Sequence, residues 1–177
     1  MTATPTYHVF VAGEVATAAN INSFGTVLAF LKQPPILQVR QTVAQSIANG
    51  IGAGTALTFT TEDVDSSGMH SNSSNTSRAT AVYPGWYRFS GGAGFAANAT
   101  GARGGYAAVN GTLLNGTSTV LPATAAGVGV VALRSVLVFL NAADYFEWLA
   151  VQSSGAALNT SVGGSEQPGM TATWESD

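Results

Sequence analysis

From residue 83 onwards, apolar and polar side chains alternate with a period of two, which is typical of half-buried β-strands. Tyr87, Phe89 and Phe95 fall on one face of the first such segment, whereas Arg88 and Ser90 fall on the other. The same alternation returns several times towards the C-terminus. It predicts strands over residues 86–95, 103–109, 128–140 and 145–151, and a last strand that contains Met170, Ala172 and Trp174.

Turn signals divide these strands at short intervals. Asn110-Gly111 follows the strand that ends near Val109, and Asn115-Gly116 comes soon after it. Asn-Gly supplies the positive φ angles that two-residue hairpins require. Short strands separated by such turns predict an all-β fold built as an antiparallel β-sandwich.

Two predicted strands, 128–140 and 145–151, are apolar on both faces, although a sandwich strand needs only one apolar face. The opposed sets are Leu137 and Phe139 against Val136, Val138 and Leu140, and Phe146 and Trp148 against Tyr145, Leu149 and Val151. We expect a subunit interface to cover the second face, and the predicted interface residues are Tyr145, Leu149, Val151, Val136 and Val138. The alternative is a covering layer from the same chain, for which the helix at 18–32 is the obvious candidate.

A helix is predicted between Thr17 and Lys32. Thr17 or Asn20 can cap its first turn, and Pro34-Pro35 ends it because proline disfavours helix before it. The apolar stripe consists of Ile21, Phe24, Leu28 and Leu31. A lone helix of this length is marginal in water, so the stripe must dock on the sandwich or on another protein.

The residues around this helix complete the predicted domain organisation. Residues 1–17 form an arm with a short β-like piece at 7–11, and 36–46 favour an extended segment. The glycine-rich residues 48–55 predict a linker, and 56–60 a strand. We therefore expect an N-terminal anchoring arm and helix over 1–55 and a jelly-roll domain over 56–177.

Amino-acid composition and charge indicate which classes of function and partner suit this chain. Only 8% of the 177 residues are charged, Lys32 is the single lysine and there is no cysteine. Soluble domains carry about a quarter charged residues, so this composition favours a subunit whose surfaces are covered by neighbours. A net charge of -3 without a basic cluster predicts no nucleic-acid partner. The longest apolar run is too short for a membrane helix, and no signal peptide is visible, so we expect no membrane partner.

Candidate chemistry is sparse. Asp63 and Asp65, followed by Ser67 and Gly68, copy the opening of a calcium loop, but the closing glutamate is replaced by Ser74. A hydrated turn explains this stretch more simply, so we expect no metal and no cofactor. The two histidines lie in different segments, and no nucleophile elbow, zinc pair or phosphate loop occurs. The sequence predicts that the protein is not an enzyme.

Several of these segments together resemble the jelly roll of tumour necrosis factor (TNF) and of complement-type globular heads. The shared features are Gly85-Trp86-Tyr87-Arg88-Phe89, the hairpin at Asn110-Gly111 and the strand after Asp144. This chain departs from the family pattern at Ala143, where glycine is usual, and at Phe146, where a β-branched residue is common. The resemblance spans about 56–175 and implies a compact trimer with Tyr145 and Leu149 towards the three-fold axis.

The leader resembles the opening of small virion proteins of tailed phages that infect actinobacteria. The matching residues are Ala12-Gly13-Glu14, residues 17–20, Phe30-Leu31 and Pro34-Pro35. The resemblance implies a virion structural protein, a homotrimeric appendage held on the tail or capsid by its N-terminal arm. Other virion proteins are then its partners, and its location is the virion, after synthesis in the bacterial host cytoplasm. The alternatives are a receptor- or glycan-binding head that adheres to the host, and a capsid decoration protein.

Overall fold

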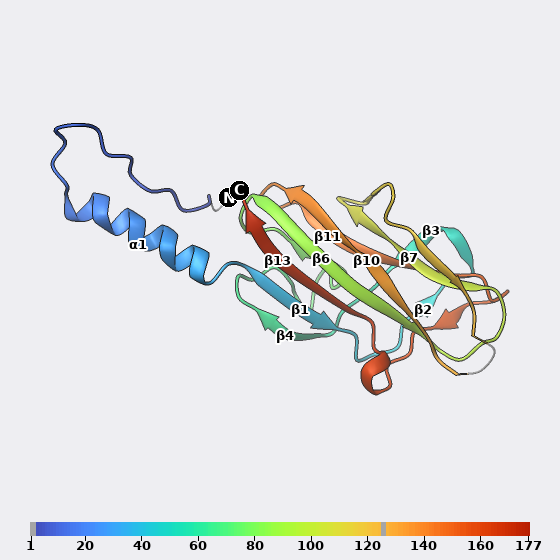
Figure 1. The fold of residues 1–177 in the computed structure, drawn as a ribbon. Helices are drawn as coiled ribbons and strands as arrows, with labels where there is room; N and C mark the ends of the chain where they lie inside the picture. The colour runs from blue at the N-terminus through green and yellow to red at the C-terminus, as the bar shows by residue number, and fades with distance from the viewer. Residues whose placement is uncertain (1–2, 125–126) are drawn as a thin grey trace.

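Two antiparallel sheets pack against each other, and a helix projects from one end of the pair (Figure 1). The computed structural model describes residues 3–124 and 127–177. The first sheet has the order β10 (Gly129–Leu140), β6 (Gly85–Phe95), β13 (Gly169–Ser176), β1 (Ile36–Arg40) and β4 (Thr61–Asp65). The second sheet has the order β5 (Ala79–Thr80), β11 (Tyr145–Gln152), β7 (Ala102–Val109) and β8 (Thr112–Leu113), with β9 (Thr119–Pro122) also paired to β7.

Four smaller elements complete the fold. β2 (Ser46–Ile47) pairs with β12 (Leu158–Asn159), β3 (Gly50–Ala56) lies against β11, and a 3-10 turn, η1, spans Gly164–Glu166. The prediction of an all-β antiparallel sandwich preceded by one short helix is therefore confirmed.

The core lies between the two sheets and is rich in aromatic rings. Phe89 of β6 stacks on Phe146 of β11 with ring centroids 3.9 Å apart, and Trp148 meets Phe146 edge-on at 4.9 Å. A fully buried phenylalanine stabilises the fold by about 1.5–3 kcal/mol. The predicted alternation is confirmed, since the buried residues include Tyr87, Phe89, Ala93, Phe95, Met170, Ala172 and Trp174.

Helix α1 (Ala18–Lys32) has the predicted bounds and cap. Thr17 is extended, and its hydroxyl accepts a hydrogen bond from the Asn20 backbone N–H at 3.2 Å. Pro34-Pro35 then leads directly into β1. Within the described residues, no side chain of the helix is fully buried. Phe30 links the helix to the aromatic core, since its ring meets Tyr83 at 5.0 Å and Trp174 at 4.8 Å, both edge-on.

The Asn110-Gly111 turn joins β7 to β8 as predicted, with φ angles of 50° and 76°. Ala143 also adopts a positive φ, 76°, in the turn between β10 and β11. This is the position where the resembling family usually has glycine, so alanine occupies a conformation that glycine tolerates better.

The N-terminal half differs from expectation. β1 lies between β13 and β4 in the first sheet, so the sheet starts at Ile36 and not at the expected boundary of 56. The glycine-rich segment expected as a linker is β3, and the expected strand at 56–60 is an extended stretch whose Leu57 and Phe59 are buried. The short piece at 7–11 is not a strand, and residues 1–2 of the expected arm lie outside the described residues. Pairing of β1 with β13, a contact between distant segments that the local sequence does not show, places Ile36–Arg40 in the first sheet.

Candidate functional site

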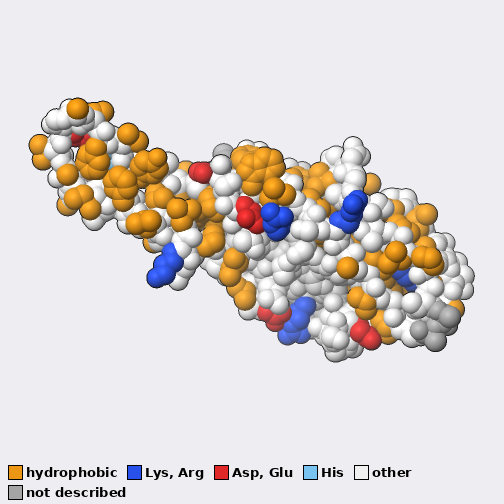
Figure 2. All heavy atoms as spheres, in the orientation of Figure 1, with side chains coloured by type: hydrophobic (Ala, Val, Ile, Leu, Met, Phe, Trp, Pro, Cys, Tyr) orange, Lys and Arg blue, Asp and Glu red, His pale blue; other side chains and the backbone are white. Residues whose placement is uncertain are grey.

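An apolar patch lies on the outer face of the first sheet, at the end next to the helix. It consists of Trp86 from β6 and Leu137 and Phe139 from β10, which we call the sheet patch. Phe139 pairs with Trp86 across the two strands, and their rings meet edge-on at 5.7 Å. Their exposed fractions are 42% for Trp86, 49% for Leu137 and 43% for Phe139. Figure 2 shows hydrophobic side chains gathered over this end of the body and on the projecting helix.

Paired polar groups lie next to the sheet patch. The Arg88 side chain donates to the Glu175 carboxylate at 2.8 Å, and the Ser90 and Thr171 hydroxyls lie 2.8 Å apart. An apolar centre with a polar surround is the usual anatomy of a protein interface. The sheet patch therefore has the composition of a contact surface.

The predicted interface residues of β10 lie on the opposite face. Val136 is 9% exposed and belongs to the core cluster, and Val138 packs against that cluster. Alternation along β10 consequently turns Leu137 and Phe139 outwards. The hydrophobic pattern of β10 separates its two faces, but the pattern of an isolated strand does not say which face meets the other sheet. In the folded chain Val136 and Val138 face the core.

Segments of the same chain cover the predicted interface residues of β11 to different extents, and Tyr145 and Leu149 remain half-buried. Val151 is fully buried, and Leu149 lies under β3, where a Cβ on Gly54 would come within 2.8 Å of the Leu149 Cβ. The guanidinium of Arg78 lies 3.9 Å from the ring centre of Tyr145. This is the same-chain layer that the sequence left open, supplied by β3 and not by the helix. Val151 is therefore buried within the single chain, whereas a subunit contact through the half-buried Tyr145 and Leu149 stays a prediction.

The predicted anchoring residues of the helix remain exposed. The exposed fractions are Ile21 57%, Phe24 38%, Leu28 65% and Leu31 55%. Phe24 is partly covered because Tyr7 and Phe10 of the arm stack on it, with centroids 5.6 and 6.0 Å away. The helix stripe thus remains available to another chain.

Hydrogen bonds at Glu14 close the arm onto the helix. The Val11 N–H donates to its carboxylate at 3.1 Å, and the Asn20 side chain donates at 3.1 Å. The Val11 N–H, together with His8 and Asn20, lowers the pKa of the Glu14 carboxyl below its usual value. The arm is therefore held along the helix by polar contacts as well as by the rings.

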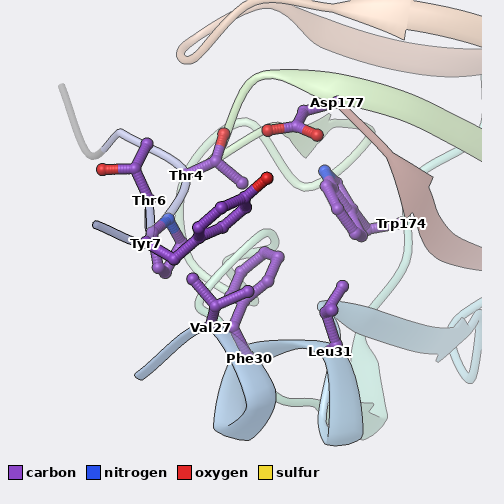
Figure 3. A pocket seen from close by; sticks show the side chains of 9 residues that line it. Thr4, Thr6, Tyr7, Val27, Phe30, Leu31, Trp174 and Asp177 are labelled. Atoms are coloured by element: carbon purple, nitrogen blue, oxygen red, sulfur yellow. The ribbon is translucent and has the colours of Figure 1, made fainter. Parts of the chain in front are cut away.

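A pocket of about 280 Å³ lies where arm, helix and body meet (Figure 3). Tyr7 comes from the arm, Phe30 from the helix and Trp174 from β13, and the Trp174 indole N–H donates to the Pro84 carbonyl at 3.1 Å. The complete lining is Thr4, Pro5, Thr6, Tyr7, Val27, Phe30, Leu31, Trp174 and Asp177. Aromatic contacts thus join the arm and the helix to the sandwich.

The two candidate metal ligands, Asp63 and Asp65, both accept hydrogen bonds from protein donors. Asp63 accepts two bonds of 3.0 Å from the Arg40 side chain. Asp65 accepts backbone N–H bonds from Ser67, Gly68, Met69 and His70 at 2.8–3.2 Å, so its carboxylate organises the turn. Within the described residues no group of three His, Cys, Asp or Glu side chains is arranged to hold a metal ion. No helix in this part of the chain is long and apolar enough to cross a membrane.

The fold of this chain, and not its sequence, is similar to that of known proteins. No protein-family model and no curated protein matches the sequence. The globular domain of zebrafish complement 1qA protein matches with a TM-score of 0.55 and 12% identity, over 81% of this chain and 99% of that chain. Murine APRIL matches with a TM-score of 0.58 and 10% identity, over 78% and 98%. At these identities the likeness establishes the fold alone: this chain has a jelly roll of the type found in TNF and in complement globular heads, as its sequence predicted.

Proposed function

We propose that the protein is a bacteriophage virion structural protein, a homotrimeric jelly-roll appendage attached to the tail or capsid by its N-terminal arm and helix. Its role is structural and not catalytic, and its location is the virion. One observation carries the proposal: two uncovered apolar surfaces, the sheet patch and the helix stripe, lie at the same end of one small, weakly charged chain.

The sheet patch supports self-association. The edge-on contact of Trp86 and Phe139 leaves much of both rings exposed, and covering them with a neighbour would remove that apolar area from water. The jelly rolls that this chain resembles form trimers, which favours three copies over two. Arg88 is already paired with Glu175 beside the patch, so a neighbour does not have to bury an unpaired charge there.

The arm supports attachment to a different protein. Val9, Val11 and Val15 are 69%, 69% and 78% exposed, on a segment that projects away from the sandwich (Figure 1). A charged fraction of 8% suits a subunit that is permanently covered by neighbours. The arm therefore provides the docking surface for a tail or capsid protein.

The trimer is tested by native mass spectrometry and light scattering on the full chain across a concentration series. We expect a mass of three chains at micromolar concentration. A monomer at every concentration contradicts the trimeric appendage.

The attachment is tested in phage particles that carry Val9→Asp. We expect this variant to fold and trimerise but to be missing from purified particles, because a charge on the arm opposes burial in a partner. Val120→Asp, on β9 and 38% exposed, is the control and should be incorporated normally. Normal incorporation of Val9→Asp contradicts the anchoring role.

A glycan-binding head is the second candidate, and one observation favours it. Trp148 and Trp174 are buried, but Trp86 is 42% exposed and able to stack on a sugar ring. Binding of the full chain to a glycan array, lost in Trp86→Ala while the trimer persists, supports this candidate. A trimer that shields Trp86 from acrylamide quenching and binds no glycan contradicts it.

A further inference from the structure

The apolar stripe of α1 has the spacing of a coiled-coil seam. Ile21, Phe24, Leu28 and Leu31 are separated by three, four and three residues, which are the a and d positions of successive heptads. A helix that packs on the body of its own domain usually carries a broader stripe. We call these four residues the helix seam. All four are exposed in the single chain, although the arm rings of Tyr7 and Phe10 stack on Phe24.

The arm leaves most of the helix seam open. It lies along one flank, where the Ser23 hydroxyl accepts the His8 N–H at 2.9 Å and the Asn20 side chain donates to Glu14. On the other flank is Gly25, where a Cβ would find no described atom within 4 Å. Gly25 leaves space beside Leu28 for a second helix to approach.

Charge does not oppose packing of identical helices. Lys32, in the last turn, is the only ionisable side chain between Ala18 and Lys32. Three parallel copies therefore bring no like charges together along the seam. The same feature means that the helix carries no e and g charges to select a partner, so selection must come from elsewhere in the chain.

The body of the protein supplies that selection. α1 enters β1 through Gln33, Pro34 and Pro35, and Figure 1 shows the helix extending beyond the sandwich at the end where β13 finishes. The sheet patch lies at this same end. A helix of 15 residues does not associate reliably by itself, but a trimeric head holds three copies at high effective concentration.

We propose that three copies of α1 pack through the helix seam into a short parallel coiled coil that continues the axis of the trimeric head. This inference rests on the homotrimer of the proposed function. It assigns the helix to self-association, which requires the rings of Tyr7 and Phe10 to move off Phe24, and it leaves the arm as the part that faces the virion.

Disulfide cross-linking of the full chain tests the coiled coil, because the natural sequence contains no cysteine. Leu28→Cys places a thiol at an a position. Thr26→Cys is the matched control, since at about 100° per residue it lies on the opposite side of the helix from the seam. Both sites are exposed in the single chain, so neither change disturbs its core. Under mild oxidation we expect Leu28→Cys to form covalent dimers on the order of ten-fold faster than Thr26→Cys, at a rate independent of protein concentration.

The possible results distinguish a failure of the coiled-coil proposal from a failure of the homotrimer proposal. If native mass shows a trimer but Leu28→Cys cross-links no faster than Thr26→Cys, the coiled coil is wrong and the trimeric head stands. A cross-linking rate that rises with protein concentration reports random collision and also overturns the coiled coil. A monomeric mass overturns both proposals.

Discussion

Replacing Leu137 with aspartate tests whether the outer face of the first sheet is the subunit interface. Leu137 points away from the core on β10 and is 49% exposed. Its cross-strand neighbour Arg88 is already paired with Glu175, but a carboxylate at this exposed position stays hydrated in the single chain. The jelly roll should therefore fold normally, and the effect should fall on association.

The expected magnitude follows from the exposed area. Full burial of a leucine is worth about 1.5–3 kcal/mol, so the exposed half that a neighbour would cover is worth about 0.7–1.5 kcal/mol per copy. Three copies lose about 2–4.5 kcal/mol in total, which weakens the trimerisation constant on the order of thirty- to a thousand-fold. Three carboxylates near one axis also repel and lose hydration, so this range is a lower bound.

Sedimentation equilibrium over a wide concentration range measures the loss directly. Leu121→Asp is a matched control because Leu121 is also 49% exposed but lies on β9 of the second sheet. We expect Leu121→Asp to trimerise like the unmodified chain. An unchanged trimerisation constant in Leu137→Asp, or an equal loss in both variants, refutes the assignment of the sheet patch to the interface.

Three further predictions concern the stability of the jelly roll. Ala143→Gly should raise the free energy of unfolding by about 0.5–1 kcal/mol in urea titrations, because a φ of 76° strains alanine more than the added chain entropy of glycine costs. Gly94→Ala should lower the free energy of unfolding by about 1–3 kcal/mol, since the new Cβ would lie 1.8 Å from the Glu166 carbonyl oxygen. Gly92→Ala is the control and should change the free energy of unfolding little, because the nearest atom to its new Cβ is 3.5 Å away. Equal effects of the two changes contradict the steric argument. Hydrogen bonds, of which the one from the Asn110 side chain has the largest effect, lower the pKa of Asp144 below its usual value of 3.8. The ionised Asp144 carboxylate therefore stabilises the fold fully above the unfolded-state pKa, and this stabilisation is lost as the pH falls through the folded-state pKa. The thermal midpoints of Asp144→Ala and the unmodified chain should accordingly differ by a constant amount above about pH 5 and converge in acid; a difference that persists at pH 2 contradicts this linkage.

Local pattern predicted the elements whose determinants are close in sequence. The cap at Thr17 lies next to the first residue of the helix, and the pair Pro34-Pro35 lies within a few residues of its last. Asn110-Gly111 sets its own hairpin through backbone preference alone. The signals for such features lie close together in the sequence, so the features can be predicted without knowledge of the rest of the chain.

The candidate interface was only partly predictable. Alternation along β10 separated Leu137 and Phe139 from Val136 and Val138, but a period of two does not say which set faces inwards. Trp86 shares a face with Arg88, and this was the available signal that its ring points outwards. Pairing of β10 with β6, across distant residues, joins the three side chains of the sheet patch.

The sequence by itself determined the class of the fold, the inward face of β6 and β13, and the apolar stripe of the helix, because each depends on residues one to four positions apart. Tertiary structure alone decided that β1 completes the first sheet and that β3 covers Leu149 and Val151. The reason is that sheet pairing and the layer above a strand are contacts between distant segments. Their free energy depends on how well two surfaces fit, and neither surface carries that information in its own pattern.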